Sequence, residues 1–297
     1  MSNEHDLSGV HVALTTPFDP MSGDVDHEAL ADQAAWLLDQ GVDGLVPNGT
    51  LGEFESLGDD ERRAVVETVA GVTEGRAKLI VGVSAPNFRI AGMHAKHAAG
   101  VGADGLLLLP PTNHAPTSAE LTDHYRSVAQ HAVPVVVCND PSASRIDLTP
   151  DLIGELARLD GIVAVAESSG DVRRLSEIAE RAPDLTLLCG TDDLALESAL
   201  MGATGWIGGF TGVLPREAAQ VFRFGRTGQH ARALPIYREM LPLLRRASRP
   251  RHVEAIKCAL DHLGLPGGGA PRPPRRVVDE IEREILGHQV DRARAGA

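Results

Sequence analysis

Four side chains able to do nucleophilic or acid–base chemistry lie at or just after the ends of apolar runs: Cys138, Glu167, Asp192 and His114. An ionised cysteine is the strongest nucleophile among them, so Cys138 is one candidate catalytic residue. Cysteine also serves as a small buried hydrophobic residue. The second interpretation is the simpler one, because no histidine is clearly placed beside Cys138.

Glu167 and Asp192 can form an acid–base pair or a cation site. Side chains alternate along a strand, and Glu167 therefore points away from the face that carries Ala166. A structural hydrogen bond is the competing interpretation of Glu167, which stays the second catalytic candidate. His114 is either a base or a solvated loop residue.

Two other patterns suggest binding sites. His94 and His97 have a spacing seen in metal sites, but no third ligand is evident, so we predict no metal and no cofactor. The backbone N–H groups of Gly49-Thr50 and Gly208-Gly209 can bind a carboxylate or phosphate. Tight turns that require glycine explain the same residues equally well.

Eight short apolar runs must position these residues. They span residues 10–18, 44–49, 79–84, 105–111, 133–140, 162–168, 185–192 and 202–209. Continuous apolar runs are typical of parallel strands covered on their outer face. Helical patterns lie between them, for example at 27–41, 59–72 and 148–159. The order predicts an α/β fold, a closed (β/α)8 barrel whose site lies at the C-terminal ends of its strands. An open doubly wound sheet is the alternative.

The chain continues well beyond the eighth run. Helical patterns at 215–228, 231–246, 253–263 and 277–286 predict a helical extension. We expect a barrel at 1–213 and an extension at 214–297 that packs on it as one structural unit. The last residues, from Gln289 onward, are expected to fray.

The composition of the chain argues against several classes of partner and location. The 297 residues carry a net charge of −13, which argues against nucleic acid and anionic membranes as partners. Three scattered cysteines favour a reducing cytoplasm over a disulfide framework. The polar N-terminus is not expected to be a signal peptide, and no run spans a bilayer. Only three of the 28 Lys and Arg residues are lysine: Lys78, Lys96 and Lys257.

Seven stretches carry motifs, in order along nearly the whole chain: GVHVALTTPFDP, GTLGEFESL, VCNDPSAS, VAVAESSGD, GTDD, GWIGG and EAIKCALDHLGLPGG. Together they resemble the dihydrodipicolinate synthase/N-acetylneuraminate lyase family. The resemblance implies a class I aldolase mechanism. In it a barrel lysine forms a Schiff base with pyruvate or another 2-oxo acid, a tyrosine moves protons, and a GTTGE loop holds the carboxylate.

The sequence departs from this family at the positions that matter most. The resemblance places Ala166 at the lysine, Cys138 at the tyrosine, Leu51 at the second threonine of the loop and Thr112 at a further tyrosine. The family's arginine falls at Ala143 or, with a shift, at Arg145. None of the three lysines is expected to reach the pocket. The predicted substrate-binding residues are Gly49, Thr50, Thr112, Asn113, Cys138, Asn139, Ala166, Ser168, Asp192 and Gly208.

Three hypotheses follow. The favoured one is a diverged lyase-type enzyme that acts on a small 2-oxo acid or related carboxylate without a Schiff base. The alternative is a catalytically inactive paralogue that binds a small acid or a partner subunit. Ordinary aldolase turnover through an unrecognised lysine is the third. The resemblance also implies a homo-oligomer, a tetramer or a dimer.

Overall fold

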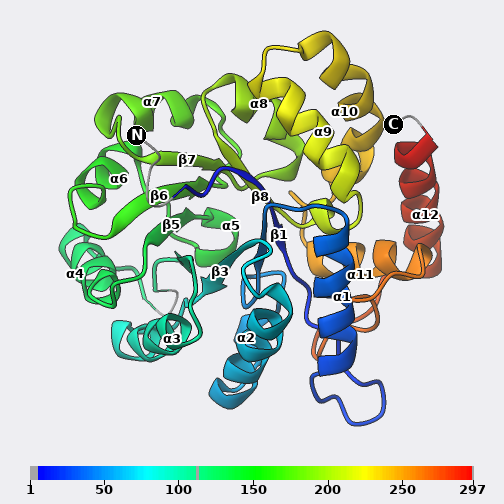
Figure 1. Cartoon of the computed structure of the whole chain (residues 1–297), viewed down its shortest axis with the longest axis horizontal. Helices are drawn as coiled ribbons and strands as arrows, with labels where there is room; N and C mark the ends of the chain where they lie inside the picture. The colour runs from blue at the N-terminus through cyan, green and yellow to red at the C-terminus, as the bar shows by residue number, and fades with distance from the viewer. Residues whose placement is uncertain (1–5, 112–113, 296–297) are drawn as a thin grey trace.

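The computed structural model describes residues 6–111 and 114–295. Its centre is a closed, all-parallel barrel in which each strand pairs with its neighbours in chain order (Figure 1). The strands are β1 (Gly9–Ala13), β2 (Gly44–Val46), β3 (Lys78–Gly82), β4 (Gly105–Leu108), β5 (Val135–Asn139), β6 (Ile162–Glu167), β7 (Thr186–Cys189) and β8 (Gly205–Gly208). The predicted fold class is confirmed.

Strands β1, β2, β4 and β7 end at least three residues before their predicted ends, and the other strands end one or two residues before theirs. The apolar run Val10–Phe18, for example, is a strand only over Gly9–Ala13. Its continuation is buried but not paired: Thr15 and Thr16 are each 1 % exposed and bond to backbone carbonyl groups of Gly267 and Gly52. Residues at the mouth of the barrel are therefore buried without pairing in the sheet, and the buried run in the sequence extends beyond the end of the strand.

Two layers of apolar side chains stabilise the barrel. The inner layer includes Val136, Cys138, Ala164 and Ala166. The outer layer holds the intervening residues of the same strands, such as Val165, packed against the helices. This alternation was predicted for β5 and β6 and is confirmed. Small side chains on the inner face of β6 leave space at the centre of the barrel.

The outer ring consists of helices that follow the strands. Their bounds are α1 (His27–Asp39), α2 (Asp59–Thr73), α3 (Phe88–Gly100), α4 (Ser118–Ala129), α5 (Pro141–Ser144), α6 (Pro150–Leu156), α7 (Arg173–Arg181) and α8 (Ala195–Leu200). Side-chain caps fix several starts: the side chains of Asp26, Asn87 and Thr149 accept bonds from backbone N–H groups of the first turn. Short 3₁₀ turns η1 (Phe54–Ser56), η2 (Asp192–Leu194) and η3 (Phe210–Gly212) lie after β2, β7 and β8.

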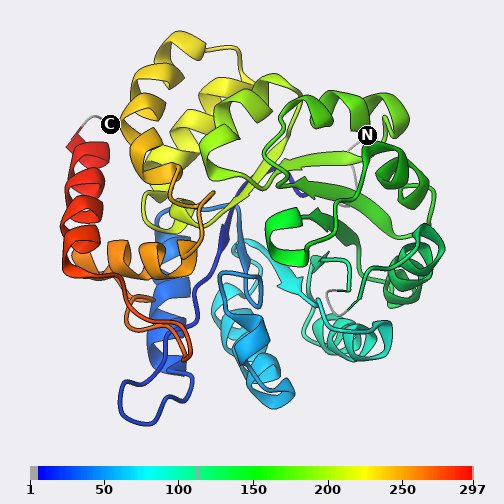
Figure 2. The ribbon, with the colours of Figure 1, turned by 180° about the vertical axis from the view of Figure 1, so that it is seen from behind.

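The chain ends in a group of helices packed on the barrel: α9 (Pro215–Arg226), α10 (His230–Leu244), α11 (His252–His262) and α12 (Glu280–Ala295). Figures 1 and 2 show α11 beside α1, far from it in sequence. The predicted boundary at 213/214 falls between η3 and α9, and its division of the chain stays a prediction. The predicted frayed tail is wrong over residues 289–295, because α12 continues to Ala295 and buries Val290 and Ala293 completely; the last two residues lie outside the described ones.

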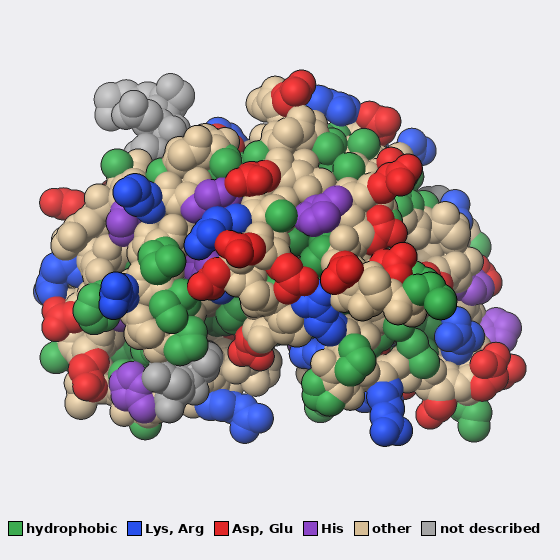
Figure 3. Space-filling model, turned by 90° about the horizontal axis from the view of Figure 1, so that it is seen from below, with side chains coloured by type: hydrophobic (Ala, Val, Ile, Leu, Met, Phe, Trp, Pro, Cys, Tyr) green, Lys and Arg blue, Asp and Glu red, His purple; other side chains and the backbone are tan. Residues whose placement is uncertain are grey.

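Acidic and basic side chains are interspersed on the face of the molecule shown in Figure 3. Within the described residues, no helix is long and apolar enough to cross a membrane.

Candidate active site

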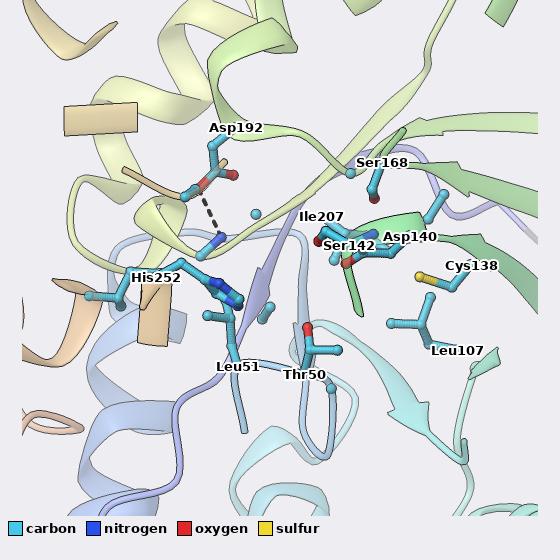
Figure 4. A pocket seen from close by; sticks show the side chains of 18 residues that line it. Thr50, Leu51, Leu107, Cys138, Asp140, Ser142, Ser168, Asp192, Ile207 and His252 are labelled. Carbon is cyan, nitrogen blue, oxygen red and sulfur yellow. Dashed lines mark hydrogen bonds between the residues drawn. The ribbon is translucent and has the colours of Figure 1, made fainter. Parts of the chain in front are cut away.

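A pocket opens at the C-terminal ends of the strands (Figure 4). Residues from β1, β4, β5, β6 and β8, from the strand-to-helix loops and from the C-terminal extension form its walls. They are Ala13, Gly49, Thr50, Leu51, Leu107, Cys138, Asp140, Ser142, Ala166, Ser168, Gly190, Asp192, Ile207, Gly208, Gly209, Ala247, His252 and Ile256. The pocket is where a barrel of this type places its chemistry.

The pocket floor is formed by Cys138 and Ala166, which are paired in register on β5 and β6. Both are buried, at 8 % and 2 % exposure. Burial raises the pKa of the Cys138 thiol well above its ordinary value, and the charges of Asp140 and Glu167 raise it further. A thiol in such surroundings is not a thiolate nucleophile. The geometry therefore supports the interpretation of Cys138 as a small buried hydrophobic residue.

The loop after β2 lines the pocket with Gly49, Thr50 and Leu51. Asn48 and Glu53 adopt left-handed backbone conformations, with φ of 57° and 53°. Between them, Gly52 N donates to Gly49 O and Glu53 N donates to Thr50 O. Among the described residues, nothing accepts a hydrogen bond from the N–H of Thr50 or Leu51, or from the Thr50 hydroxyl. Adjacent unpaired N–H groups in a tight loop form a small anion site.

This loop is held from behind by Lys257. The Lys257 Nζ lies 2.8 Å from Glu53 Oε1 and donates to Thr16 O at 2.8 Å. The Lys257 and Glu53 side chains are each 1 % exposed, and Arg272 N donates to the other Glu53 carboxylate oxygen at 3.0 Å. Burial lowers the pKa of Lys257, while the carboxylate of Glu53 opposes that change. Lys257 is thus engaged outside the pocket.

The two other lysines also lie elsewhere. Lys78 begins β3, at the opposite end of the barrel, and pairs with Asp104 at 2.9 Å. Lys96 is exposed on α3. Of the described residues that line the pocket, none is a lysine or an arginine.

Asp192 borders the pocket but is committed to the backbone of the β8 loop. It accepts hydrogen bonds from Trp206 Nε1 at 3.0 Å, Gly209 N at 3.2 Å and Phe210 N at 2.9 Å. Burial raises the pKa of Asp192 to about 6, although these bonds lower it. Gly208 is tightly packed against the same group, since a Cβ there would lie 2.2 Å from Asp192 Oδ1.

Glu167 and Asn139 do not line the pocket. Asn139 Nδ2 donates to Glu167 Oε2 at 2.9 Å, and Ser169 N donates to Glu167 Oε1 at 2.6 Å. Asn139 Oδ1 accepts a bond from Leu148 N. The structural hydrogen bond predicted for Glu167 is confirmed. Burial raises the pKa of the Glu167 carboxyl, and the hydrogen bonds oppose this.

His252 is a pocket residue that the sequence analysis missed. It begins α11 in the C-terminal extension and reaches the pocket from the side opposite Cys138, Asp140 and Ser142 (Figure 4). Burial lowers its pKa, and the negative charge of Asp140 opposes that change. No motif or spacing signals this residue. Only the folding of the extension over the barrel mouth brings it to the site.

Of the other predicted positions, three do not line the pocket and two lie outside the described residues. Arg145 is exposed at the end of α5 and does not line the pocket. Ala143 packs against the inner apolar layer, and His114 is exposed. Thr112 and Asn113 lie outside the described residues.

The histidines on α3 pair with carboxylates of α2. His94 lies 3.2 Å from Asp59 and His97 lies 2.9 Å from Glu67. Among residues 6–111 and 114–295, no three His, Cys, Asp or Glu side chains are grouped to hold a metal ion.

Comparison of the sequence with known proteins identifies the family of this chain. A model of the dihydrodipicolinate synthetase family matches residues 6–293. The chain belongs to the dihydrodipicolinate synthetase family. Within it, the chain is 33 % identical over 281 residues to the 4-hydroxy-tetrahydrodipicolinate synthase of Methanospirillum hungatei, covering 94 % of this chain and 95 % of that protein.

Two solved structures of this family have closely similar folds. The dihydrodipicolinate synthase of Aquifex aeolicus superposes with a TM-score of 0.92 at 30 % identity, over 97 % of this chain and 99 % of that one. YagE from Escherichia coli K12, solved in complex with pyruvate, gives a TM-score of 0.91 at 26 % identity, over 97 % and 99 % of the two chains.

Proposed function

We propose that this member of the dihydrodipicolinate synthetase family is a lyase-type enzyme for a small monocarboxylate of the 2-oxo acid class, and that it works without a Schiff base. The observation that carries this proposal is Ala166. It stands on the inner face of β6, beside Cys138 on the pocket floor, where the family resemblance requires a lysine.

A Schiff base requires a free amine within reach of the ligand carbonyl. The described pocket lining contains no lysine, and arginine cannot replace one because its guanidinium stays protonated. Lys257 holds the loop that lines the pocket, but its ammonium group is bonded to Glu53 and Thr16 O. The ordinary lysine-dependent step is therefore not expected in this chain.

Retention of a carboxylate ligand is supported by the loop after β2. Thr50 and Leu51 line the pocket, and their N–H groups and the Thr50 hydroxyl have no partner among the described residues, so they are available to one carboxylate. A relative in this family, YagE, was solved with pyruvate bound. We therefore place a 2-oxo acid in this pocket with its carboxylate on the Thr50–Leu51 loop.

The rest of the ligand should carry no second negative charge. Two carboxylates, Asp140 and Asp192, line the pocket, and the described lining supplies no lysine or arginine to offset them. Like charges in a partly buried site repel strongly. Apolar side chains complete the wall: Leu51, Leu107, Ile207 and Ile256. A monocarboxylate with a short apolar or neutral tail fits these surroundings best.

Two measurements test the proposal. Borohydride reduction in the presence of pyruvate should leave the protein mass unchanged, and a covalent adduct would refute the absence of a Schiff base. Pyruvate and 2-oxobutyrate should raise the melting temperature progressively, with the logarithm of ligand concentration once it exceeds Kd, whereas 2-oxoglutarate should raise it much less. Equal stabilisation by 2-oxoglutarate would contradict the charge argument.

Turnover separates the enzyme from an inactive paralogue. Release of pyruvate from 4-hydroxy-2-oxo acids, followed with lactate dehydrogenase and NADH, is expected for a lyase. A protein that is stabilised by these acids but releases no product would be the ligand-binding paralogue instead.

A further inference from the structure

His252 differs from every other titratable group that lines the pocket. It enters from the C-terminal extension, whereas Cys138, Asp140 and Ser142 enter from β5 and the start of α5 on the opposite side (Figure 4). The space between the two sides lies above the Thr50–Leu51 loop. A ligand held by its carboxylate on that loop would therefore have His252 on one side and the β5 residues on the other.

The other pocket groups are poorly suited to proton transfer. The Cys138 thiol is buried and neutral. Asp192 accepts three hydrogen bonds that hold the β8 loop. Asp140 caps α5 through one oxygen, since Ser142 N, Ser142 Oγ and Ala143 N all donate to its Oδ1. An imidazole is the common proton carrier near neutral pH, and His252 is the described pocket residue that supplies one.

Three charged groups on different segments act on His252. Asp140 follows β5, Glu254 belongs to α11, and Arg275 belongs to the segment between α11 and α12. The two carboxylates favour the protonated imidazole, Arg275 disfavours it, and burial disfavours it most. Proximity of the Arg249 backbone also favours the protonated ring. The imidazole is therefore neutral at pH 7 and can accept a proton.

We propose that His252 is the proton-transfer residue of this pocket, exchanging a proton with carbon 3 of a bound 2-oxo acid. This assignment rests on the proposed function. The neutral ring accepts the proton, and the electrons of the C–H bond form the C=C bond of an enolate whose charge lies on the former carbonyl oxygen. The Ser168 hydroxyl lines the pocket, has no partner among the described residues, and can donate to that oxygen. The reverse step returns a proton from the imidazolium.

Exchange of the methyl protons of pyruvate for deuterium tests this assignment. The whole protein is incubated with pyruvate in D2O, and loss of the methyl signal is followed by NMR. The wild type should accelerate exchange over buffer. His252→Asn should lower the accelerated rate about 100-fold or more, as expected on loss of a general base, while pyruvate still raises the melting temperature. His230→Asn, at an exposed site at the start of α10, should exchange like the wild type.

The pH profile gives a second readout that needs no folded variant at position 252. Exchange by the wild type should rise with pH and level off once one group with a pKa below 6.5, the ordinary histidine value, is deprotonated. In Asp140→Asn the rise should move to lower pH, because a charge that favours the protonated ring is gone. A rise governed instead by a group with a pKa well above 7 would overturn the assignment.

The outcomes separate the two proposals. Full exchange in His252→Asn, or binding of pyruvate by the wild type without any exchange, overturns the role of His252 and leaves the proposed ligand intact. Absence of binding by any 2-oxo acid, or a borohydride adduct, overturns the proposed function and the role of His252 with it.

Discussion

Cys138 and Ala166 stand directly opposite each other on β5 and β6, side by side on the pocket floor. The pair leaves this floor without an amine and without an ionised side chain, since the Cys138 thiol is held neutral by burial. The inner face of β6 is otherwise formed by the equally small Ala164. The floor is thus a surface for packing, and polar contacts come from the loops above it.

Ala166→Lys should restore an amine to the floor. We expect pyruvate and borohydride to give a covalent adduct with this variant, because burial lowers the pKa of a lysine toward the free-amine form. Overpacking should lower the free energy of unfolding by about 1–3 kcal/mol. Intact-protein mass spectrometry with and without pyruvate measures the adduct. A folded variant that remains unmodified would mean that position 166 does not face the bound ligand.

Lys257→Met should be strongly destabilising, because it leaves the buried Glu53 carboxylate without its cation. Loss of one partner of a buried ion pair costs about 3–5 kcal/mol, and the stabilisation by pyruvate should weaken because Glu53 ends the Thr50–Leu51 loop. Denaturant unfolding measures the first effect and thermal shift the second. The matched control is Lys96→Met at an exposed position, which should change stability by less than about 0.5 kcal/mol.

Asp192 should make the folded state more stable at low pH than at neutral pH. Its pKa is about 6 in the folded protein against an ordinary value of 3.8, so the folded state binds the proton more tightly. Asp192 stabilises the folded state fully at a pH low enough to protonate it in both the folded and the unfolded state. This stabilisation is lost as pH rises from about 4 to 6. The pKa difference corresponds to roughly 3 kcal/mol.

Comparison with Asp192→Asn isolates this effect, because Glu167 also has a raised pKa. The wild type should lose stability relative to the variant between pH 4 and 6. At pH 4 the free energy of unfolding of the variant should be lower than that of the wild type by about 1–3 kcal/mol, because an amide cannot accept all three hydrogen bonds. A difference between the two proteins that does not change with pH would contradict the raised pKa.

Substitution by alanine should affect stability differently at two glycines that line the pocket. A Cβ at Gly208 would lie 2.2 Å from Asp192 Oδ1 and 2.6 Å from Trp206 Nε1, whereas one at Gly49 meets nothing within 4 Å. Gly208→Ala should cost about 1–3 kcal/mol, and Gly49→Ala should leave the melting temperature nearly unchanged. Equal losses in the two variants would show that the β8 loop can shift to accept a methyl group.

The barrel could be predicted from the sequence because each strand is buried on both faces and therefore reads as an apolar run. The same rule misplaced the strand ends. Residues such as Thr15 and Thr16 are buried at the barrel mouth without belonging to a ladder. The end of α12 was missed for a related reason, since Val290 and Ala293 are buried by helices distant in sequence.

The floor of the site was also predictable, because strand alternation fixes which residues of β5 and β6 face inward. The walls were not. His252 reaches the pocket through the packing of the extension, and nothing in its local sequence indicates where that helix will lie. Asn139 was predicted to bind the substrate, whereas alternation predicted that Glu167 points away from the inner face. The two side chains form a hydrogen-bonded pair and do not line the pocket.

The contacts of Lys257 and Arg272 limit the order in which parts of this protein can fold during synthesis. Lys257 bonds to Thr16, 241 residues earlier, and Arg272 bonds to Glu53, 219 residues earlier. A ribosome completes the eight strands well before it delivers these partners, and domains generally fold as units during synthesis. Until Lys257 and Arg272 have been synthesised, the Glu53 carboxylate lacks both of these partners. We therefore expect the ligand loop to reach its final form only after α11 and the segment that follows it have left the ribosome.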